Sequence, residues 1–113
     1  MTRCSTIVLN VPIYQTAHYQ VTADAVDDVV AAIKEFVAYV AANEPGTRMY
    51  RAWQQKDDPT SFVHLFEFAD DDAHRLHGRS DAVKRFESVY QPVLAAGSVR
   101  FTDYVEVAVN SLG

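Results

Sequence analysis

Two runs of β-forming residues joined by a short polar turn constrain this chain more than any other feature. The runs are 48–55 and 61–68, and the turn is KDDP, Lys56 to Pro59. Two such runs with a short polar connection predict a β-hairpin. This hairpin forms the centre of the predicted order of elements.

An extended segment and an amphipathic helix precede the hairpin. Residues 14–22 are rich in β-forming residues, and they follow a leading segment, 1–12, that ends at a proline. Asp24 is expected to cap the helix, which should end at Asn43 because Pro45 and Gly46 follow. Apolar residues at helical spacing make one stripe along it: Val26, Val29, Val30, Ile33, Phe36, Val37 and Val40.

Two shorter helices and a strand are expected after the hairpin. The acidic triplet 70–72 should begin a helix that runs to about His77 and is broken by Gly78. Ser80 should cap the next helix, and Pro92 should stop it. The expected inward face of that helix is Val83, Phe86, Val89 and Tyr90. Residues 99–109, with alternating Val105, Val107 and Val109, should form the last strand.

This order predicts an α+β fold of the ferredoxin-like βαββαβ kind, with two main helices over one face of a four-stranded antiparallel sheet. At 113 residues one domain is expected, which we place at 13–113 after the leading segment 1–12. Both sides of the 61–68 run carry large apolar residues. Because a water-exposed sheet face should be polar, we expect a second copy of the chain to cover the other face as a homodimer.

Charge and composition exclude several classes of function. The net charge of −5, with scattered basic residues, argues against a nucleic-acid partner and against an anionic membrane surface. No segment approaches the roughly 20 apolar residues of a membrane span. A single cysteine, Cys4, forms no internal disulfide, so a cytoplasmic location is expected.

The segment EPGTRMYRAWQQKDDPTSFVHLFEFADDDAHRLHGRSDAVKRF, residues 44–86, resembles the antibiotic-biosynthesis-monooxygenase (ABM) superfamily, in particular its small quinol-monooxygenase-like members. The likeness includes the EPG break after the first helix, Tyr50, the DP turn, and His77 followed by Ser80. The resemblance implies a dimeric α/β barrel and a cofactor-independent oxygenase acting on quinols or polycyclic phenols. The resemblance does not by itself establish which reaction the chain catalyses, because one fold supports many functions.

His77 is the candidate catalytic residue, because it matches the family's histidine at the end of the short helix. A neutral imidazole there could take a proton from a phenolic hydroxyl and leave an anion that reacts with dioxygen. The structural alternative is a helix-terminal histidine whose ring bonds a carbonyl. No metal or other cofactor is expected, because His74 and His77 lack a third ligand at zinc-site spacing.

The candidate substrate-binding residues are mostly aromatic, as suits a planar phenolic ligand: Tyr50, Trp53, His64, Phe66, Phe86 and Tyr90. Tyr50 and Trp53 should point to opposite sides of their strand, and we expect Tyr50 to face the helices. We expect His64 to lie at the dimer interface with its hydrogen bonds satisfied, rather than to form part of a pocket wall. Glu67 should be a buried, inward-facing structural acid, and Arg85 is a candidate for binding an oxyanion.

The sequence therefore supports a cofactor-independent monooxygenase of phenolic substrates, with a non-catalytic dimeric domain that binds a small aromatic ligand, or serves in a stress response, as the alternative. The haem-degrading branch is not expected. The 61–68 strand ends in Phe68 rather than tryptophan, and the helix after Ser80 has no histidine.

Overall fold

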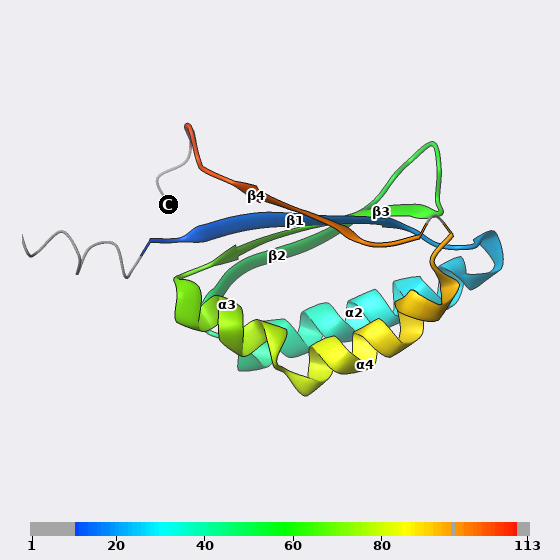
Figure 1. Ribbon diagram of the computed structural model, residues 1–113, viewed down its shortest axis with the longest axis horizontal. Helices are drawn as coiled ribbons and strands as arrows, with labels where there is room; N and C mark the ends of the chain where they lie inside the picture. Colours follow the sequence, from blue (N-terminus) through cyan, green and yellow to red (C-terminus); the bar gives the residue numbers. More distant parts are fainter. Residues whose placement is uncertain (1–10, 96, 111–113) are drawn as a thin grey trace, which may run out of the picture.

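The computed structural model describes residues 11–95 and 97–110, so nearly all of the predicted leading segment lies outside the described residues. One antiparallel sheet forms a layer, and the helices cover one of its faces (Figure 1). The elements are β1 Ile13–Gln20, η1 Ala23–Ala25, α2 Val26–Asn43, β2 Thr47–Gln54, β3 Ser61–Phe68, α3 Asp71–Gly78, α4 Asp81–Tyr90, η2 Gln91–Val93 and β4 Arg100–Tyr104. With the strand order β2-β3-β1-β4, the predicted ferredoxin-like fold is confirmed.

The sheet is organised around β3, which pairs with β2 on one side and β1 on the other. Its side chains alternate strictly between the two faces, as the strand period requires. Phe62, His64, Phe66 and Phe68 are buried on the helix-covered face, whereas the residues between them are half-buried on the other, open face. The hairpin turn is held by Asp58, whose carboxylate accepts bonds from the Thr60 amide and the Ser61 hydroxyl.

The stripe of α2 packs onto the sheet and against α4, with Val29, Ile33, Phe36 and Val40 buried. The predicted cap was wrong. Asp24 lies inside the 3₁₀ turn η1 that leads into the helix, and Ala25 stands at the N-cap position without a side-chain bond. The extra turn moves the helix start past the acidic residue.

The two shorter helices follow the predicted capping chemistry. The Asp70 side chain accepts a bond from the Ala73 amide at 2.9 Å, and the Ser80 hydroxyl accepts one from the Val83 amide at 3.1 Å. Gly78 is the last residue of α3, whereas the prediction ended this helix at about His77 and made Gly78 the break after it. On α4, Ala82 is buried and Val89 is only half-buried, so the inward face is rotated slightly from the predicted one.

The last strand is shorter than predicted. β4 ends at Tyr104, which pairs with Tyr14 near the beginning of β1. Beyond that point, the described part of the chain offers the segment no strand to pair with. Val105 and Val107 are therefore 84% and 93% exposed, and the alternation of valines did not produce strand pairing there.

Gly46 permits a close approach between the start of β2 and α3. A Cβ at this position would lie 2.6 Å from the Ala73 Cβ, whereas a Cβ at Gly78 would meet nothing within 4 Å. We expect Gly46→Ala to lower the free energy of unfolding by about 1–3 kcal/mol, because the two backbones must move apart. Gly78→Ala should be neutral or slightly stabilising. Urea unfolding of both variants checks this, and equal effects would contradict it.

Candidate functional site

A cavity of about 430 Å³ lies between the helix-covered face of the sheet and the helices α3 and α4. It contains His77 and most of the predicted substrate-binding residues: Tyr50, His64, Phe66, Phe86 and Tyr90. The sheet supplies one side of its wall and α3 and α4 supply most of the other, which Phe36 of α2 and Val99 complete. A volume of this size suits a small aromatic molecule.

Trp53 is the one predicted substrate-binding residue that the structure does not bring to this cavity. It lies on the open face of β2, 53% exposed, and lines a separate hollow with His18, Val63 and Arg100. Tyr50, three positions earlier, points to the helices, as predicted. The two side chains therefore belong to opposite faces of the sheet.

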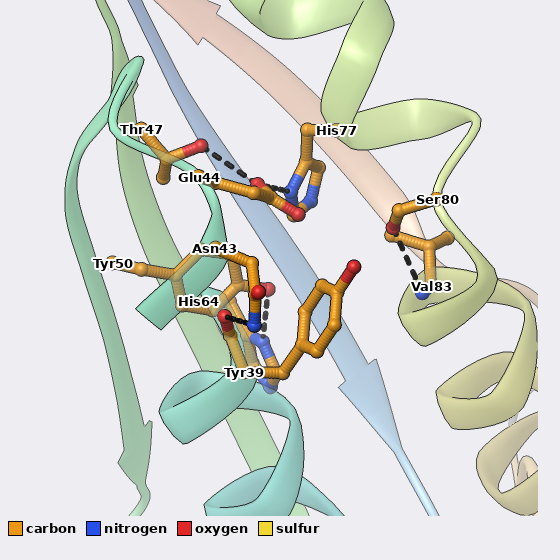
Figure 2. Close-up of polar contacts among 9 residues, drawn as sticks. All are labelled: Tyr39, Asn43, Glu44, Thr47, Tyr50, His64, His77, Ser80 and Val83. Atoms are coloured by element: carbon orange, nitrogen blue, oxygen red, sulfur yellow. Dashed lines mark hydrogen bonds and ion pairs between the residues drawn. The ribbon is translucent and has the colours of Figure 1, made fainter. Parts of the chain in front are cut away.

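His77 is held by a buried carboxylate. Its Nδ1 lies 2.7 Å from Oε1 of Glu44, and both side chains are about nine-tenths buried (Figure 2). The Thr47 hydroxyl donates a second bond to the same oxygen at 2.8 Å. The structural alternative considered for His77, a bond to a carbonyl, is replaced by this bond to a carboxylate.

The contact with Glu44 fixes which nitrogen of His77 is available for chemistry. An ionised carboxylate can only accept, so beside it a neutral His77 carries its proton on Nδ1 and keeps the lone pair on Nε2. Such a carboxylate orients the ring and stabilises the imidazolium that forms when Nε2 takes up a proton. Oε2 of Glu44 is buried and has no hydrogen-bond partner among the described residues. The pair therefore has the geometry that a general base and an orienting carboxylate require.

His64 is enclosed by two tyrosine hydroxyls. Its Nε2 lies 2.7 Å from the Tyr19 hydroxyl and its Nδ1 lies 2.8 Å from the Tyr50 hydroxyl, and the residue is 1% exposed. The expectation that His64 sits at a dimer interface was wrong. It faces the helices, because it shares its side of β3 with Phe62 and Phe66.

Burial controls the protonation of these groups. It lowers the pKa of His64 to about 4, so the imidazole is neutral at pH 7. Burial, followed by the neighbouring tyrosines, raises the pKa of Tyr19 and of Tyr50, and burial likewise raises the pKa of Tyr90. All three tyrosines remain hydroxyls at neutral pH and can donate as well as accept.

Stacked rings make the cavity walls flat. Tyr50 lies parallel to Phe66 with ring centroids 5.1 Å apart, and Tyr19 stacks on Tyr90 at the same separation. The His64 and Phe86 rings are 5.7 Å apart. Aromatic packing of this kind holds the side chains in fixed positions and suits a planar ligand.

The remaining polar candidates lie elsewhere or lack partners. Glu67 was predicted to face inward, but it lies on the open face of β3 and pairs with Arg48 at 3.1 Å. Arg85 is exposed on α4 and does not line the cavity. His74 does line it, but within residues 11–95 and 97–110 no cluster of three His, Cys, Asp or Glu could hold a metal ion.

Two residues of the site were missed by sequence reasoning. Glu44 is the acid of the EPG motif, which we used only as a helix end, and Tyr19 lies two positions from Ala17 on the inward side of β1. The strand period could have placed Tyr19 on the inward face. Nothing local predicted the contact of Glu44 with His77, because the two residues are distant in sequence.

The fold and the cavity together define a small α+β domain with an aromatic-walled cavity between its sheet and its helices. The sequence matches the family model described as ABM, antibiotic biosynthesis monooxygenase, over residues 12–88, which is more than half of the chain. The chain therefore belongs to the antibiotic biosynthesis monooxygenase family. No curated protein matches it by sequence.

Solved structures share the fold at low identity. A candidate antibiotic biosynthesis monooxygenase from Bacteroides thetaiotaomicron is similar with a TM-score of 0.81 and 16% identity, covering 90% of this chain and 95% of that one. A candidate of the same kind from Caulobacter crescentus gives 0.76 and 24%, covering 92% and 99%. Rv0793 from Mycobacterium tuberculosis gives 0.78 and 18%, covering 89% and 100%. Among the described residues, none of the helices has the length and apolarity to span a bilayer.

The depressed pKa of His64 predicts a stability loss in acid. The unfolded state protonates this histidine near its ordinary pKa of about 6.5, whereas the folded state does so only near 4, so the fold weakens as the pH falls between these values. Between pH 7.5 and 5.0 the wild type should lose about 2 kcal/mol more than His64→Gln. Urea unfolding at both pH values measures the difference, and parallel losses would contradict the assignment.

Proposed function

We propose that this chain is a cofactor-independent monooxygenase that oxidises a quinol or polycyclic phenol with dioxygen, using His77 as its base. The observation that supports it is the His77–Glu44 pair at the wall of an aromatic cavity. Family membership adds the general expectation of a monooxygenase. The cavity residues Tyr50, His64, Phe66, Phe86 and Tyr90 would hold the substrate.

In the proposed reaction, Nε2 of His77 takes the proton of a phenolic hydroxyl. The Nδ1 proton stays on the bond to Glu44, whose negative charge stabilises the imidazolium. The resulting phenolate is electron-rich enough to reduce dioxygen. One quinol and one dioxygen give one hydroxyquinone and one water, so the substrate supplies every electron and no flavin or metal is required.

Oxygen uptake with a panel of hydroquinones and dihydroxynaphthalenes tests this function. We expect uptake that depends on the protein and falls about 10²-fold in His77→Ala, which is the usual scale of general-base catalysis. Glu44→Gln should lower the rate less, because the ring keeps a partner but loses the charge. His18→Ala, on the opposite face of the sheet, is the matched histidine control.

Uptake at the uncatalysed background rate with every compound would contradict catalysis and favour the second candidate, a non-catalytic domain that holds a small aromatic ligand. The flat, stacked walls of the cavity support that alternative independently of the base. Equal loss in His77→Ala and His18→Ala would remove His77 from the role of base.

We also propose that a second copy of the chain covers the open face of the sheet. This face carries the exposed Trp53 and Tyr104 and the half-buried Val63 and Leu65, and no described segment packs over it. An apolar sheet face of this kind is typical of a self-complementary interface.

The expected cytoplasmic location also stays a prediction.

Sedimentation at micromolar concentration tests the interface. The wild type should sediment as a dimer and Trp53→Asp as a monomer, because a charge would be buried at the symmetric contact. Leu76→Asp changes a similarly exposed apolar residue on α3, away from this face, and should leave the dimer intact. A monomeric wild type would overturn the proposal.

A further inference from the structure

The reaction proposed above does not use the hydrogen bonds that join Tyr19, His64 and Tyr50. All three residues line the cavity, and the two tyrosines come from different strands on either side of β3. Among the described residues, neither hydroxyl has a hydrogen-bond partner other than His64. Each hydroxyl therefore has hydrogen-bonding capacity left for a ligand, since it is one donor and two acceptors.

A neutral imidazole between two hydroxyls can exist as either of two tautomers, which make the same number of hydrogen bonds. One nitrogen carries a proton and donates it, and the other accepts. If Nε2 carries the proton, Tyr19 accepts from it and keeps its own hydrogen free, while Tyr50 donates to Nδ1. In the other tautomer the two tyrosines exchange these roles, and no hydrogen bond is lost in either.

This exchange has a consequence for what the cavity can bind. One hydroxyl always has a hydrogen to donate to a ligand, and the other offers only lone pairs. The tautomer of His64 decides which tyrosine can donate to a ligand and which can only accept. A hydroxyl or a carbonyl oxygen on the ligand can therefore meet the kind of partner that it needs. Phe62 and Phe66 occupy the neighbouring inward positions of β3, and an apolar residue at His64 would fill the core without the cost of burying a polar ring.

We propose that Tyr19, His64 and Tyr50 form an oxygen-recognition element that binds a planar aromatic ligand with its oxygen substituent either as a hydroxyl or as a carbonyl. The substrate class rests on the proposed function, in which a phenolic hydroxyl becomes a carbonyl. The same wall would then hold the ligand before and after oxidation. The binding itself requires no turnover.

Binding without oxygen tests the element separately from catalysis. Under anaerobic conditions, titration calorimetry would compare naphthalene, 1,4-dihydroxynaphthalene and 1,4-naphthoquinone. The wild type should bind both oxygenated compounds at least about tenfold more tightly than naphthalene. Tyr19→Phe and Tyr50→Phe should each weaken both oxygenated ligands and leave naphthalene unchanged. Tyr14→Phe, on the open face of β1, is the matched control.

Nitrogen-15 spectra of histidine-labelled wild-type protein supply a readout that needs no variant. Adding dihydroxynaphthalene or naphthoquinone should shift the His64 ring nitrogens, because each ligand alters the balance of tautomers, whereas naphthalene should not. His64 signals that do not respond to either oxygenated ligand would overturn the proposal, as would equal binding of naphthalene.

The monooxygenase proposal and the oxygen-recognition proposal can be contradicted independently of each other. Unchanged affinity in folded Tyr19→Phe and Tyr50→Phe, alongside oxygen uptake that depends on His77, would remove the recognition element and leave the monooxygenase. Shifted His64 signals and weakened binding in the variants, with no oxygen uptake, would leave an aromatic-ligand-binding domain without catalysis.

Discussion

The burial of one face of β3 against α2 and α4 is the contact on which the rest of the molecule depends. Phe62, His64, Phe66 and Phe68 form a continuous row on this face, and β1 and β2 extend it with Tyr19 and Tyr50. The same burial that stabilises the fold also removes water from the histidine and tyrosine side chains. Core and site are therefore built from one set of residues, and the cavity is the part of the core that the side chains leave unfilled.

The fold was predictable because its signals are local. The hairpin turn, the apolar stripe of α2 and the Ser80 cap each follow from the chemistry of a few neighbouring residues, and β3 appears with the predicted bounds. The errors occurred where a local signal met a tertiary constraint. Asp24 does not cap the helix, because it lies inside a 3₁₀ turn. The strand β4 ends where its partner β1 begins.

The site was predictable only in part, for a related reason. Strand periodicity and the family likeness together placed His77, Tyr50 and Phe86 in the region of the cavity. The contact between Glu44 and His77 depends on how the segment after α2 packs against the end of α3. The periodicity of apolar residues in the sequence does not predict this packing. His64 was assigned to the wrong face, and Glu67 was taken for the buried acid, because alternation along a strand distinguishes two faces but does not say which one the helices cover.

Oε2 of Glu44, which is buried and has no hydrogen-bond partner among residues 11–95 and 97–110, makes the site costly for the stability of the fold. A buried carboxylate with one oxygen unsatisfied among the described residues costs folding free energy that an uncharged side chain would avoid. Gly46, two positions later, adds a second constraint, because only the smallest residue fits beside Ala73. Removing the acid would leave Nδ1 of His77 and the Thr47 hydroxyl without the oxygen that both now contact, so the energetic cost of Glu44 and the fixed position of the histidine cannot be separated.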